Sequence, residues 1–507
     1  MTAADTPGLA PCLAVLGTGS DVGKSVVAAG LCRICRQMGI RVAPFKAQNM
    51  SNNSGVTPEG LEMGRAQIVQ AEACGVAPRV DMNPVLLKPS GEQGSQVILL
   101  GRVYGNSTAR EYYQDKTHLE TEARKALDRL RRDFDLVIME GAGSCAEVNL
   151  MAHDFVNLRM AAYGEARVIL VADIHRGGVF AQIVGSLACL SRDQQAMIKG
   201  FLINRFRGDV SLFADGVEWI EQHTGKRVFG VLPWYQDITI EAEDSVVIEK
   251  SNLDQRFDWS RPCLGVLRLP YISNFTDFHA LTRISGLSVG FVETPRDLSR
   301  FQAVILPGSK NTRSDLNWLH GSGWAGRLAA YAQDGGCILG ICGGYQMLGQ
   351  AVEDPDGVEG SPGSTPGLNL LALRTILQSP KTTSWSTFVW GPAKGAGYEI
   401  HMGRSVLLDG AQPWLEVDSR NNEACQDLDG CISPDGRILG CYMHGLFDEP
   451  QILAAWLQHL GLEALSLPRD SGWRQARQQE YDRLARHMQE HLDVQGLLQG
   501  SLQHVQI

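Results

Sequence analysis

The sequence Gly335-Gly-Cys-Ile-Leu-Gly-Ile-Cys-Gly-Gly-Tyr-Gln-Met-Leu-Gly349 combines a strand, a sharp turn and the start of a helix. The apolar run 337–341 predicts a buried strand, and the residues from Tyr345 onward predict the helix. Cys342 lies at the turn between them, where a reactive side chain can be held exposed. Glycines two residues to either side of Cys342 remove the clashes that such a turn would cause. The stretch therefore predicts an α/β sheet that carries a nucleophilic cysteine.

The surroundings of Cys342 supply the other groups that a nucleophilic thiol needs. A helix that begins after the cysteine offers free N–H groups and a positive dipole end, which favour a thiolate and stabilise an oxyanion. His444 ends a second apolar run, 437–444, and is the candidate base. The turn at 306–309 ends another strand, and the expected oxyanion-hole donors are the amides of Gly343 and of Gly308 or Ser309. The alternatives are a structural cysteine and an ordinary core or surface histidine.

Residues 261–450 resemble a class I glutamine amidotransferase domain, in which a Cys–His pair releases ammonia from glutamine through a thioester. Leu306-Pro-Gly-Ser-Lys-Asn-Thr312 and Gly397-Tyr-Glu-Ile-His-Met-Gly403 resemble the subgroup found in cobalamin-pathway amide synthases. Class I domains commonly place a carboxylate two residues after the histidine. Here Gly445 and Leu446 follow His444, so these motifs do not identify the group that orients the imidazole.

The N-terminal part contains a phosphate-binding pattern. The apolar run 12–16 precedes Gly17-Thr-Gly-Ser-Asp-Val-Gly-Lys24-Ser25, and an apolar-periodic helix is expected at 26–38. Backbone N–H groups of such a loop cradle phosphates, Lys24 meets the terminal ones and Ser25 reaches Mg²⁺. A plain glycine turn would need neither side chain. The loop is one residue longer than usual and resembles that of dethiobiotin synthetases. The expected ATP-binding residues are Gly17, Thr18, Gly19, Asp21, Val22, Gly23, Lys24, Ser25 and, by that resemblance, Asn204.

Further apolar runs alternate with helical patterns, which predicts a doubly wound parallel sheet. They lie at 42–45, 97–100, 136–139, 168–171, 201–203 and 228–231. Ligands of such folds gather at the carboxyl ends of the strands. Glu140 follows one of these strands and is the expected second Mg²⁺ ligand beside Ser25, with a solvated carboxylate as the alternative. Lys46, Gln48 and Asn49 follow another and are expected to contact substrate or phosphate, a role that the resemblance implies for Lys46.

The polar segment 233–262 predicts a domain boundary near residue 255. The expected organisation is a phosphate-loop domain at 1–255, a second α/β domain of the amidotransferase type at 256–450 and a helical extension at 451–507. The second domain is expected to have strands at 263–267, 287–292 and 303–306. Residues 352–366 are expected to form a surface loop, and 474–499 a solvated capping helix.

Composition excludes several kinds of partner. The net charge of -10 argues against nucleic acid, because phosphate binding favours a basic face. No run of about eighteen apolar residues is present, and the N-terminus lacks the pattern of a signal peptide, so no membrane contact is expected. The twelve cysteines show no paired spacing, which fits reduced thiols in the cytoplasm. The oligomeric state is not indicated.

Two sites with different chemistry on one chain predict an ATP-dependent, glutamine-hydrolysing amide synthase. Phosphorylation by ATP gives a carboxylate a good leaving group, and ammonia released nearby has a high local concentration. The motifs, with Pro44-Phe-Lys-Ala-Gln-Asn-Met-Ser-Asn-Asn53, resemble the cobyric acid synthase family. That resemblance implies ATP, Mg²⁺ and glutamine as ammonia donor. It also implies a small-molecule corrin acceptor, adenosylcobyrinic acid a,c-diamide, amidated at its b, d, e and g side chains to adenosylcobyric acid in cobalamin biosynthesis.

Two alternatives stay open at this point. Cobyrinic acid a,c-diamide synthases carry acidic residues after the second strand, where this chain has the asparagine-rich segment 48–53. A nucleotide-switched regulatory ATPase with an inert amidotransferase-like domain is the other alternative. Such ATPases usually have a second lysine at the position of Gly19. The motifs do not assign the residues that contact the corrin, the ammonia route or the order of the amidations.

Overall fold

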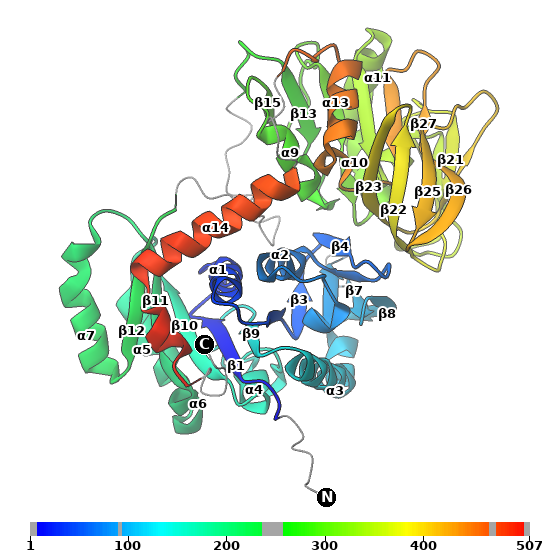
Figure 1. Cartoon of the computed structure of the whole chain (residues 1–507). Coiled ribbons are helices and arrows are strands. Elements are labelled where there is room, and N and C mark those ends of the chain that lie inside the picture. Colours follow the sequence, from blue (N-terminus) through cyan, green and yellow to red (C-terminus); the bar gives the residue numbers. More distant parts are fainter. Residues whose placement is uncertain (1–7, 90–93, 236–256, 466–472, 501–507) are drawn as a thin grey trace, which may run out of the picture.

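The computed structural model describes residues 8–89, 94–235, 257–465 and 473–500, and it contains two α/β units (Figure 1). The first unit is drawn in blue to green and the second in green to orange. The predicted combination of a doubly wound parallel sheet with a second α/β unit is confirmed. The predicted boundary near residue 255 lies outside the described residues.

The first unit is built on a six-stranded parallel sheet. Its strand order is β12-β11-β10-β1-β9-β2, and every neighbouring pair is parallel. Side chains alternate between the two faces of the sheet, so β1 sends Leu13 and Val15 into one apolar core and Ala14 and Leu16 into another. The strands are β1 Cys12–Gly17, β2 Val42–Phe45, β9 Leu136–Glu140, β10 Arg167–Asp173, β11 Ile198–Phe206 and β12 Arg227–Pro233.

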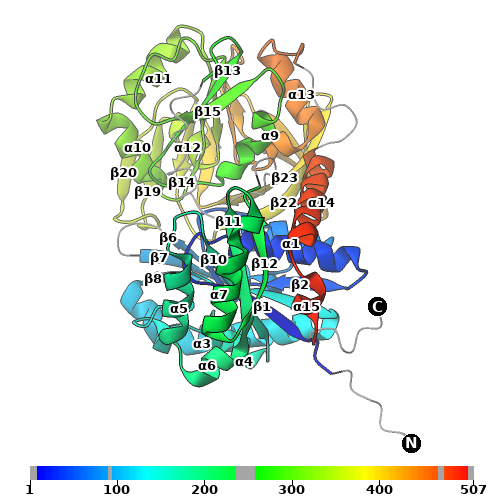
Figure 2. The ribbon, with the colours of Figure 1, turned by 90° about the vertical axis from the view of Figure 1, so that its left-hand side faces the viewer.

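Helices connect these strands and cover the sheet (Figure 2). They are α1 Lys24–Gln37, α2 Arg65–Cys74, α3 Ala109–Asp133, α4 Leu158–Tyr163, α5 Val179–Ala188, α6 Arg192–Met197 and α7 Ala214–Thr224. Because β1, β2 and β9 are neighbours and parallel, their carboxyl ends meet at one edge of the sheet. This edge receives the phosphate loop after β1, Lys46 after β2 and Glu140 at the end of β9.

The expectation that 97–100 forms a strand of the parallel sheet is wrong. This run belongs to β7 Gly94–Leu99, which pairs antiparallel with both neighbours in a separate four-stranded sheet. Leu100 and Gly101 both have positive φ, at 46° and 77°, in the tight turn that joins β7 to β8. A turn of this kind forces an antiparallel hairpin, whatever the apolar pattern of the strand. The sheet is ordered β3-β6-β7-β8, with β3 Gln48–Met50, β6 Val85–Pro89 and β8 Arg102–Thr108. A separate antiparallel pair is formed by β4 Ser54–Val56 and β5 Glu62–Gly64.

The second unit has its own six-stranded sheet, ordered β15-β13-β16-β18-β28-β27. Only its edge pair, β27 with β28, is antiparallel among the described strands. The strands are β13 Cys263–Leu267, β15 Ser288–Val292, β16 Ala303–Leu306, β18 Cys337–Ile341, β27 Cys431–Ile432 and β28 Ile438–Cys441. The helices are α9 His279–Thr282, α10 Thr312–Gly321, α11 Trp324–Gln333, α12 Gly343–Leu348 and α13 Pro450–His459. The run 437–444 is therefore shorter as a strand than expected, and it ends three residues before His444.

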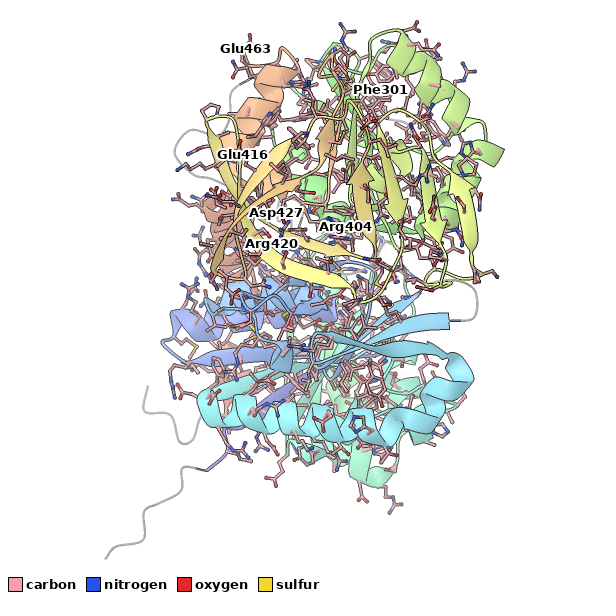
Figure 3. All side chains as sticks on the ribbon, turned by 90° about the vertical axis from the view of Figure 1, so that its right-hand side faces the viewer. Phe301, Arg404, Glu416, Arg420, Asp427 and Glu463 are labelled. Atoms are coloured by element: carbon pink, nitrogen blue, oxygen red, sulfur yellow. The ribbon has the colours of Figure 1, made fainter. Side chains whose placement is uncertain are left out.

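Two four-stranded sheets, one antiparallel and one mixed, lie on the outer side of the second unit (Figure 3). In the first, β23-β22-β25-β26, Arg420 of β25 and Asp427 of β26 form an ion pair. The second, β20-β19-β21-β24, corrects the expectation of a surface loop at 352–366, because β19 and β20 form a hairpin there. Buried Asp354 accepts hydrogen bonds from the backbone of residues 358 and 359 and so fixes that hairpin. The strands are β19 Ala351–Asp354, β20 Gly363–Pro366, β21 Leu373–Ile376, β22 Thr382–Trp390, β23 Ala393–His401, β24 Arg404–Leu407, β25 Leu415–Arg420 and β26 Glu423–Asp429.

The C-terminal helices α14 Trp473–His491 and α15 Val494–Leu498 return to the first unit (Figures 1 and 2). Tyr481, Leu484 and Met488 of α14 are buried in the same apolar core as α1. A Cβ atom on Gly30 would lie 2.0 Å from the sulfur of Met488, so the two helices approach closely. The expectation of a solvated helix is wrong for this face, because helical periodicity does not show what an apolar face packs against.

Candidate active site

The turn around Cys342 has the strand–turn–helix geometry that its sequence predicts. Strand β18 ends at Ile341 and α12 begins at Gly343, while Cys342 adopts φ 53° and ψ -109°. A residue other than glycine in this region is strained, and the surrounding structure must hold it there. A Cβ atom on Gly344 would lie 2.1 Å from the carbonyl oxygen of Leu306, and one on Gly340 would lie 2.7 Å from that of Gly344. Close backbone contacts thus require both glycines that flank the cysteine.

The group that orients His444 is Asp277, which sequence reasoning missed. The Nδ1 of His444 donates a hydrogen bond to Oδ2 of Asp277 over 2.7 Å, and the amide of Gly445 donates to Oδ1 over 3.1 Å. Asp277 lies in the short helix η5 Phe275–Phe278, which follows β14 Ile272–Ser273. Both side chains are almost fully buried. Asp277 precedes the histidine by 167 positions, so local spacing could not reveal it. The available signal was its place soon after the carboxyl end of strand 263–267, at the edge where ligands gather.

Charges around the imidazole favour its protonated form. Burial lowers the pKa of His444, but the negative charges of Asp277 and the Cys342 thiolate outweigh this effect and raise the pKa to about 10. The imidazolium then stands beside the sulfur of Cys342. In its protonated form the thiol donates a hydrogen bond to the carbonyl of Ile400, with Sγ 3.5 Å from the oxygen. The Tyr398 ring stacks on the imidazole of His444, with centroids 5.2 Å apart.

The expected oxyanion-hole residues also lie beside this pair. Gly308 and Ser309 form β17, which pairs with Ser273 and Ile272 of β14. A Cβ atom on Gly343 would lie 2.8 Å from the backbone nitrogen of Ser309, and one on Gly308 would lie 3.2 Å from Cε1 of His444. The structure therefore brings all three candidates together around the cysteine and the histidine. Their roles as donors to an oxyanion stay predictions.

The phosphate loop closes around the side chain of Lys24. Gly23 has φ 97°, a left-handed conformation that permits the tight turn into α1. The Nζ of Lys24 donates to the carbonyls of Gly19 over 2.9 Å and Gly143 over 2.8 Å. Of the other expected ATP-binding residues, Gly17 ends β1, Thr18, Asp21 and Val22 lie on the turn that follows, and Ser25 is in the first turn of α1.

Asn204 supports this loop from the end of β11. Its Nδ2 donates to the carbonyl of Val22 over 2.8 Å, and its side chain is fully buried. The structure thus places Asn204 beside the loop with its amide already engaged inside the protein. A contact of Asn204 with the adenine stays a prediction.

Ser25 and Glu140 meet at the edge where Mg²⁺ is expected. The hydroxyl of Ser25 donates to Oε1 of Glu140 over 2.7 Å, and Nζ of Lys46 lies 3.0 Å from the same oxygen. Gln70 donates to the other oxygen of Glu140 over 2.5 Å. Hydroxyl and carboxylate oxygens are the ligand type that Mg²⁺ prefers, with phosphate oxygens completing such sites. No cluster of three His, Cys, Asp or Glu side chains suited to a metal occurs among the described residues.

The other residues expected to contact substrate or phosphate differ in their surroundings. Asn49 is buried, and its Nδ2 donates to Oε1 of Gln67 over 3.0 Å. Gln48 precedes it in β3 and is half-buried. Lys46 is the member of this group that directly contacts Glu140. The contact of all three residues with substrate or phosphate stays a prediction.

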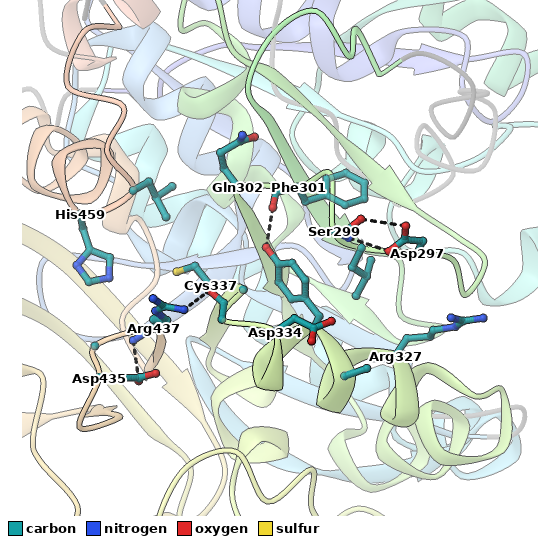
Figure 4. A pocket seen from close by; sticks show the side chains of 17 residues that line it. Asp297, Ser299, Phe301, Gln302, Arg327, Asp334, Cys337, Asp435, Arg437 and His459 are labelled. Carbon is teal, nitrogen blue, oxygen red and sulfur yellow. Dashed lines mark hydrogen bonds between the residues drawn. The ribbon is translucent and has the colours of Figure 1, made fainter.

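A cavity of about 650 Å³ in the second unit lies away from this chemistry (Figure 4). Cys337 and Arg437 line it, and these residues stand at the beginnings of the strand runs that lead to Cys342 and His444. The hydroxyl of Tyr331 donates to the carbonyl of Phe301 within the same cavity. Ligands of parallel sheets bind at the carboxyl ends of the strands, whereas this cavity lies at the opposite ends. This cavity is therefore not the candidate active site, despite its volume.

Comparisons with known proteins identify a family for each unit, a nucleotide-binding family for the first and an amidotransferase family for the second. Residues 13–247 match the family described as the CobQ/CobB/MinD/ParA nucleotide binding domain, and 264–452 match the CobB/CobQ-like glutamine amidotransferase domain. The cobyric acid synthase of Pelodictyon phaeoclathratiforme is 49% identical over 95% of this chain and 96% of its own length. The chain belongs to the cobyric acid synthase family. Membership in the cobyric acid synthase family was predicted from the motifs, and it is confirmed.

Other cobyric acid synthases show the same extent of similarity. The protein of Chlorobium phaeobacteroides is 48% identical, covering 95% of each chain. That of Chlorobaculum tepidum is 48% identical over 96% of this chain and 97% of its own length. The similarity to the cobyric acid synthase family thus includes both candidate sites. Among the described helices, none combines the length and the apolar character that crossing a membrane requires.

Proposed function

We propose that Cys342, His444 and Asp277 release ammonia from glutamine, and that the phosphate-loop unit uses ATP to activate a corrin carboxylate for amidation. As a member of the cobyric acid synthase family, the protein is a glutamine-hydrolysing carbon–nitrogen ligase of cobalamin biosynthesis. Its reaction converts adenosylcobyrinic acid a,c-diamide into adenosylcobyric acid by amidation of the b, d, e and g side chains. The observation that supports two separate half-reactions is the Cys342–His444–Asp277 arrangement in a chain that also contains the phosphate-loop residues Lys24 and Ser25.

In the glutamine half-reaction, the thiolate of Cys342 attacks the side-chain amide carbon. The amides of Gly343 and of Gly308 or Ser309 stabilise the oxyanion, each donor contributing about 10²–10³ in rate. The imidazolium of His444 gives its proton to the leaving nitrogen, so ammonia departs and a thioester remains. A water molecule, deprotonated by the now neutral imidazole, then hydrolyses the thioester to glutamate. Asp277 holds the imidazole in the tautomer that these steps need.

In the synthetic half-reaction, a carboxylate oxygen of the corrin attacks the terminal phosphorus of ATP and ADP leaves. Lys24 stabilises the charge that develops on the transferring phosphoryl group. Ser25 and Glu140 would hold Mg²⁺, which would neutralise charge on the phosphate oxygens. Ammonia attacks the activated carbonyl carbon, and phosphate leaves as the amide forms. Lys46 lies beside Glu140 and is placed to contact the phosphate or the acceptor.

We place the reaction in the cytoplasm, because all twelve cysteines are free thiols in the structure. The alternative acceptor, cobyrinic acid, and the alternative of a nucleotide switch are both disfavoured by the full-length similarity to cobyric acid synthases.

The decisive experiment incubates the purified protein with ATP, Mg²⁺ and glutamine, and offers each acceptor in a separate reaction. The products are identified by mass analysis. We expect fourfold amidation of adenosylcobyrinic acid a,c-diamide. Amidation of cobyrinic acid at its a and c side chains would instead support the a,c-diamide synthase. ATP hydrolysis without amide formation on either acceptor would support the switch protein.

A further inference from the structure

The short helix that carries Asp277 is held by the other unit of the protein. Asn274 immediately precedes this helix and has a left-handed conformation, with φ 52°. Its Nδ2 donates to the carbonyl of Ser54, in the first unit, over 2.8 Å. The hydroxyl of Thr276, which is adjacent to Asp277, donates to Oδ1 of Asn53 over 3.3 Å. Two side chains that closely precede Asp277 in the chain are therefore anchored on residues 53 and 54.

Asn274 also contacts the aromatic ring that covers the imidazole. Its Nδ2 lies 3.1 Å from the hydroxyl of Tyr398, whose ring stacks on His444. The backbones of Tyr398 and His444 exchange two hydrogen bonds, of 3.1 Å and 2.8 Å. A single amide thus connects the first unit with both the carboxylate-bearing helix and the residue packed on the base. Only 2% of the surface of Asn274 is exposed, so the loss of its amide leaves buried polar groups without their hydrogen-bond donor.

The anchor in the first unit is itself firmly held. The carbonyl of Asn53 accepts a hydrogen bond from the amide of Arg65 over 3.1 Å. The hydroxyl of Ser54 donates to Glu62 over 2.9 Å, and this buried carboxylate pairs with Lys88 over 2.7 Å and with Lys381 of the second unit over 2.6 Å. Buried, mutually satisfied groups of this kind give a rigid support. The segment is therefore suited to fixing the position of a neighbouring side chain.

We propose that residues 53–54 of the synthetase unit complete the glutamine site, and that Asn274 and Thr276 are positioning residues that hold Asp277 against His444. This inference rests on the proposed roles of Cys342, His444 and Asp277. The carboxylate must face Nδ1 of the imidazole for the correct tautomer and for the raised pKa of His444. A misplacement of about 1 Å far from the reacting atoms can cost about 10²-fold in rate. Release of ammonia thus depends on a contact with the unit that consumes it.

Three substitutions in the full-length protein test this role. Thr276→Val removes one hydrogen bond at nearly constant volume, and Thr276→Ser retains the hydroxyl. Asn274→Gly removes the amide while tolerating the left-handed backbone. Asn422→Gly is a matched control, because Asn422 also has a left-handed conformation, with φ 66°, and its Nδ2 donates to the first unit at the carbonyl of Pro58 over 3.4 Å.

The measurements are glutamine hydrolysis as a function of pH and amide synthesis with ammonium salts. We expect Asn274→Gly to lower kcat for glutamine hydrolysis by about 10²-fold and Thr276→Val by about 10-fold, with Thr276→Ser close to wild type. The alkaline limb of the pH profile should move to lower pH in the two impaired variants, because a displaced carboxylate raises the pKa of His444 less. Ammonia-dependent synthesis should stay at the wild-type level in all variants.

The inference is overturned if Thr276→Val and Asn274→Gly match Asn422→Gly in both glutamine hydrolysis and the alkaline limb. It is also overturned if Thr276→Ser loses as much activity as Thr276→Val, since the hydroxyl would then be irrelevant. Cys342→Ala, assayed in parallel, separates this result from the proposed function. If Cys342→Ala still hydrolysed glutamine, the proposed function itself would be wrong.

Discussion

The glutamine site and the phosphate loop both lie at the carboxyl end of an inner strand of a six-stranded sheet. They differ in the partners that their charged side chains have in the absence of substrate. In the glutamine site, Asp277 and His444 are already in contact and Cys342 is within reach of the imidazole. In the phosphate loop, Lys24 is occupied by two backbone carbonyls. The first site is complete before its substrate arrives, whereas the second must exchange internal partners for phosphate oxygens.

This difference follows from the chemistry of the two reactions. Thiolate and imidazolium stabilise each other, so a preformed pair costs little and speeds attack on glutamine. A phosphate loop has no such internal counter-charge for its backbone amides. Its lysine is held by carbonyls that a terminal phosphate replaces with a stronger, charge-assisted bond. The two sites should therefore respond to substitution independently.

The largest expected effect is that of Cys342→Ala on glutamine hydrolysis. Removal of a nucleophile can lower kcat by about 10⁶-fold, because no other group can form the thioester. Ammonia-dependent synthesis should persist at the wild-type level, since acyl activation belongs to the first unit. Assays with glutamine and with ammonium salts check both statements. Loss of ammonia-dependent synthesis in a folded variant would contradict the separation of the two sites.

The next effect is that of Asp277→Asn, which tests the preformed state of the glutamine site. An asparagine stabilises the wrong tautomer of the imidazole, and the equivalent change in a serine protease costs about 10⁴-fold in kcat. The carboxylate raises the pKa of His444, so its removal lowers that pKa and the imidazolium is lost at a lower pH. We therefore expect the alkaline limb of glutamine hydrolysis to follow the His444 pKa of about 10 in the wild type and to move to lower pH in the variant. A pH profile with an unmoved limb would rule out this role for Asp277.

Lys24→Ala should lower synthesis by about 10²–10³-fold with either nitrogen source. The reason is that Lys24 stabilises the transferring phosphoryl group, a step that both routes share. Glutamine hydrolysis measured alone should stay near the wild-type rate, as the comparison of the two sites requires. Near-normal ammonia-dependent synthesis in this variant would remove the phosphate loop from the reaction.

The smallest effect expected here is that of Glu140→Gln on the requirement for Mg²⁺. The amide keeps the volume of the side chain but removes one negatively charged oxygen ligand, so the metal binds more weakly. We expect the Mg²⁺ concentration for half-maximal synthesis to rise by about 10-fold, with kcat less affected at saturating metal. A Mg²⁺ titration of ammonia-dependent synthesis measures this. An unchanged titration curve would show that Glu140 is not a metal ligand.

The sequence by itself determined the local parts of both sites. The pattern 337–349 specified the strand, the strained turn at Cys342 and the following helix, because small residues are required where backbone atoms approach within 3 Å. The phosphate loop was equally readable, since its glycines, Lys24 and Ser25 lie within nine consecutive positions. Most of the strands that the sequence predicts are present for the same reason. A short apolar run bounded by turns is typical of a buried strand, because it is too short for most helices.

Only the tertiary structure decided how distant segments pair. Asp277 reaches His444 from another strand end, and Ser54 reaches Asn274 from the other unit, contacts that no local pattern encodes. The run 97–100 was predicted to be in the parallel sheet, but a turn of two residues pairs it antiparallel with β8. The periodicity of 474–499 predicted a solvated helix, and only the structure shows that one face of α14 is buried in the same core as α1. Periodicity fixes which side chains need a partner, whereas the choice of partner depends on the packing of the whole chain.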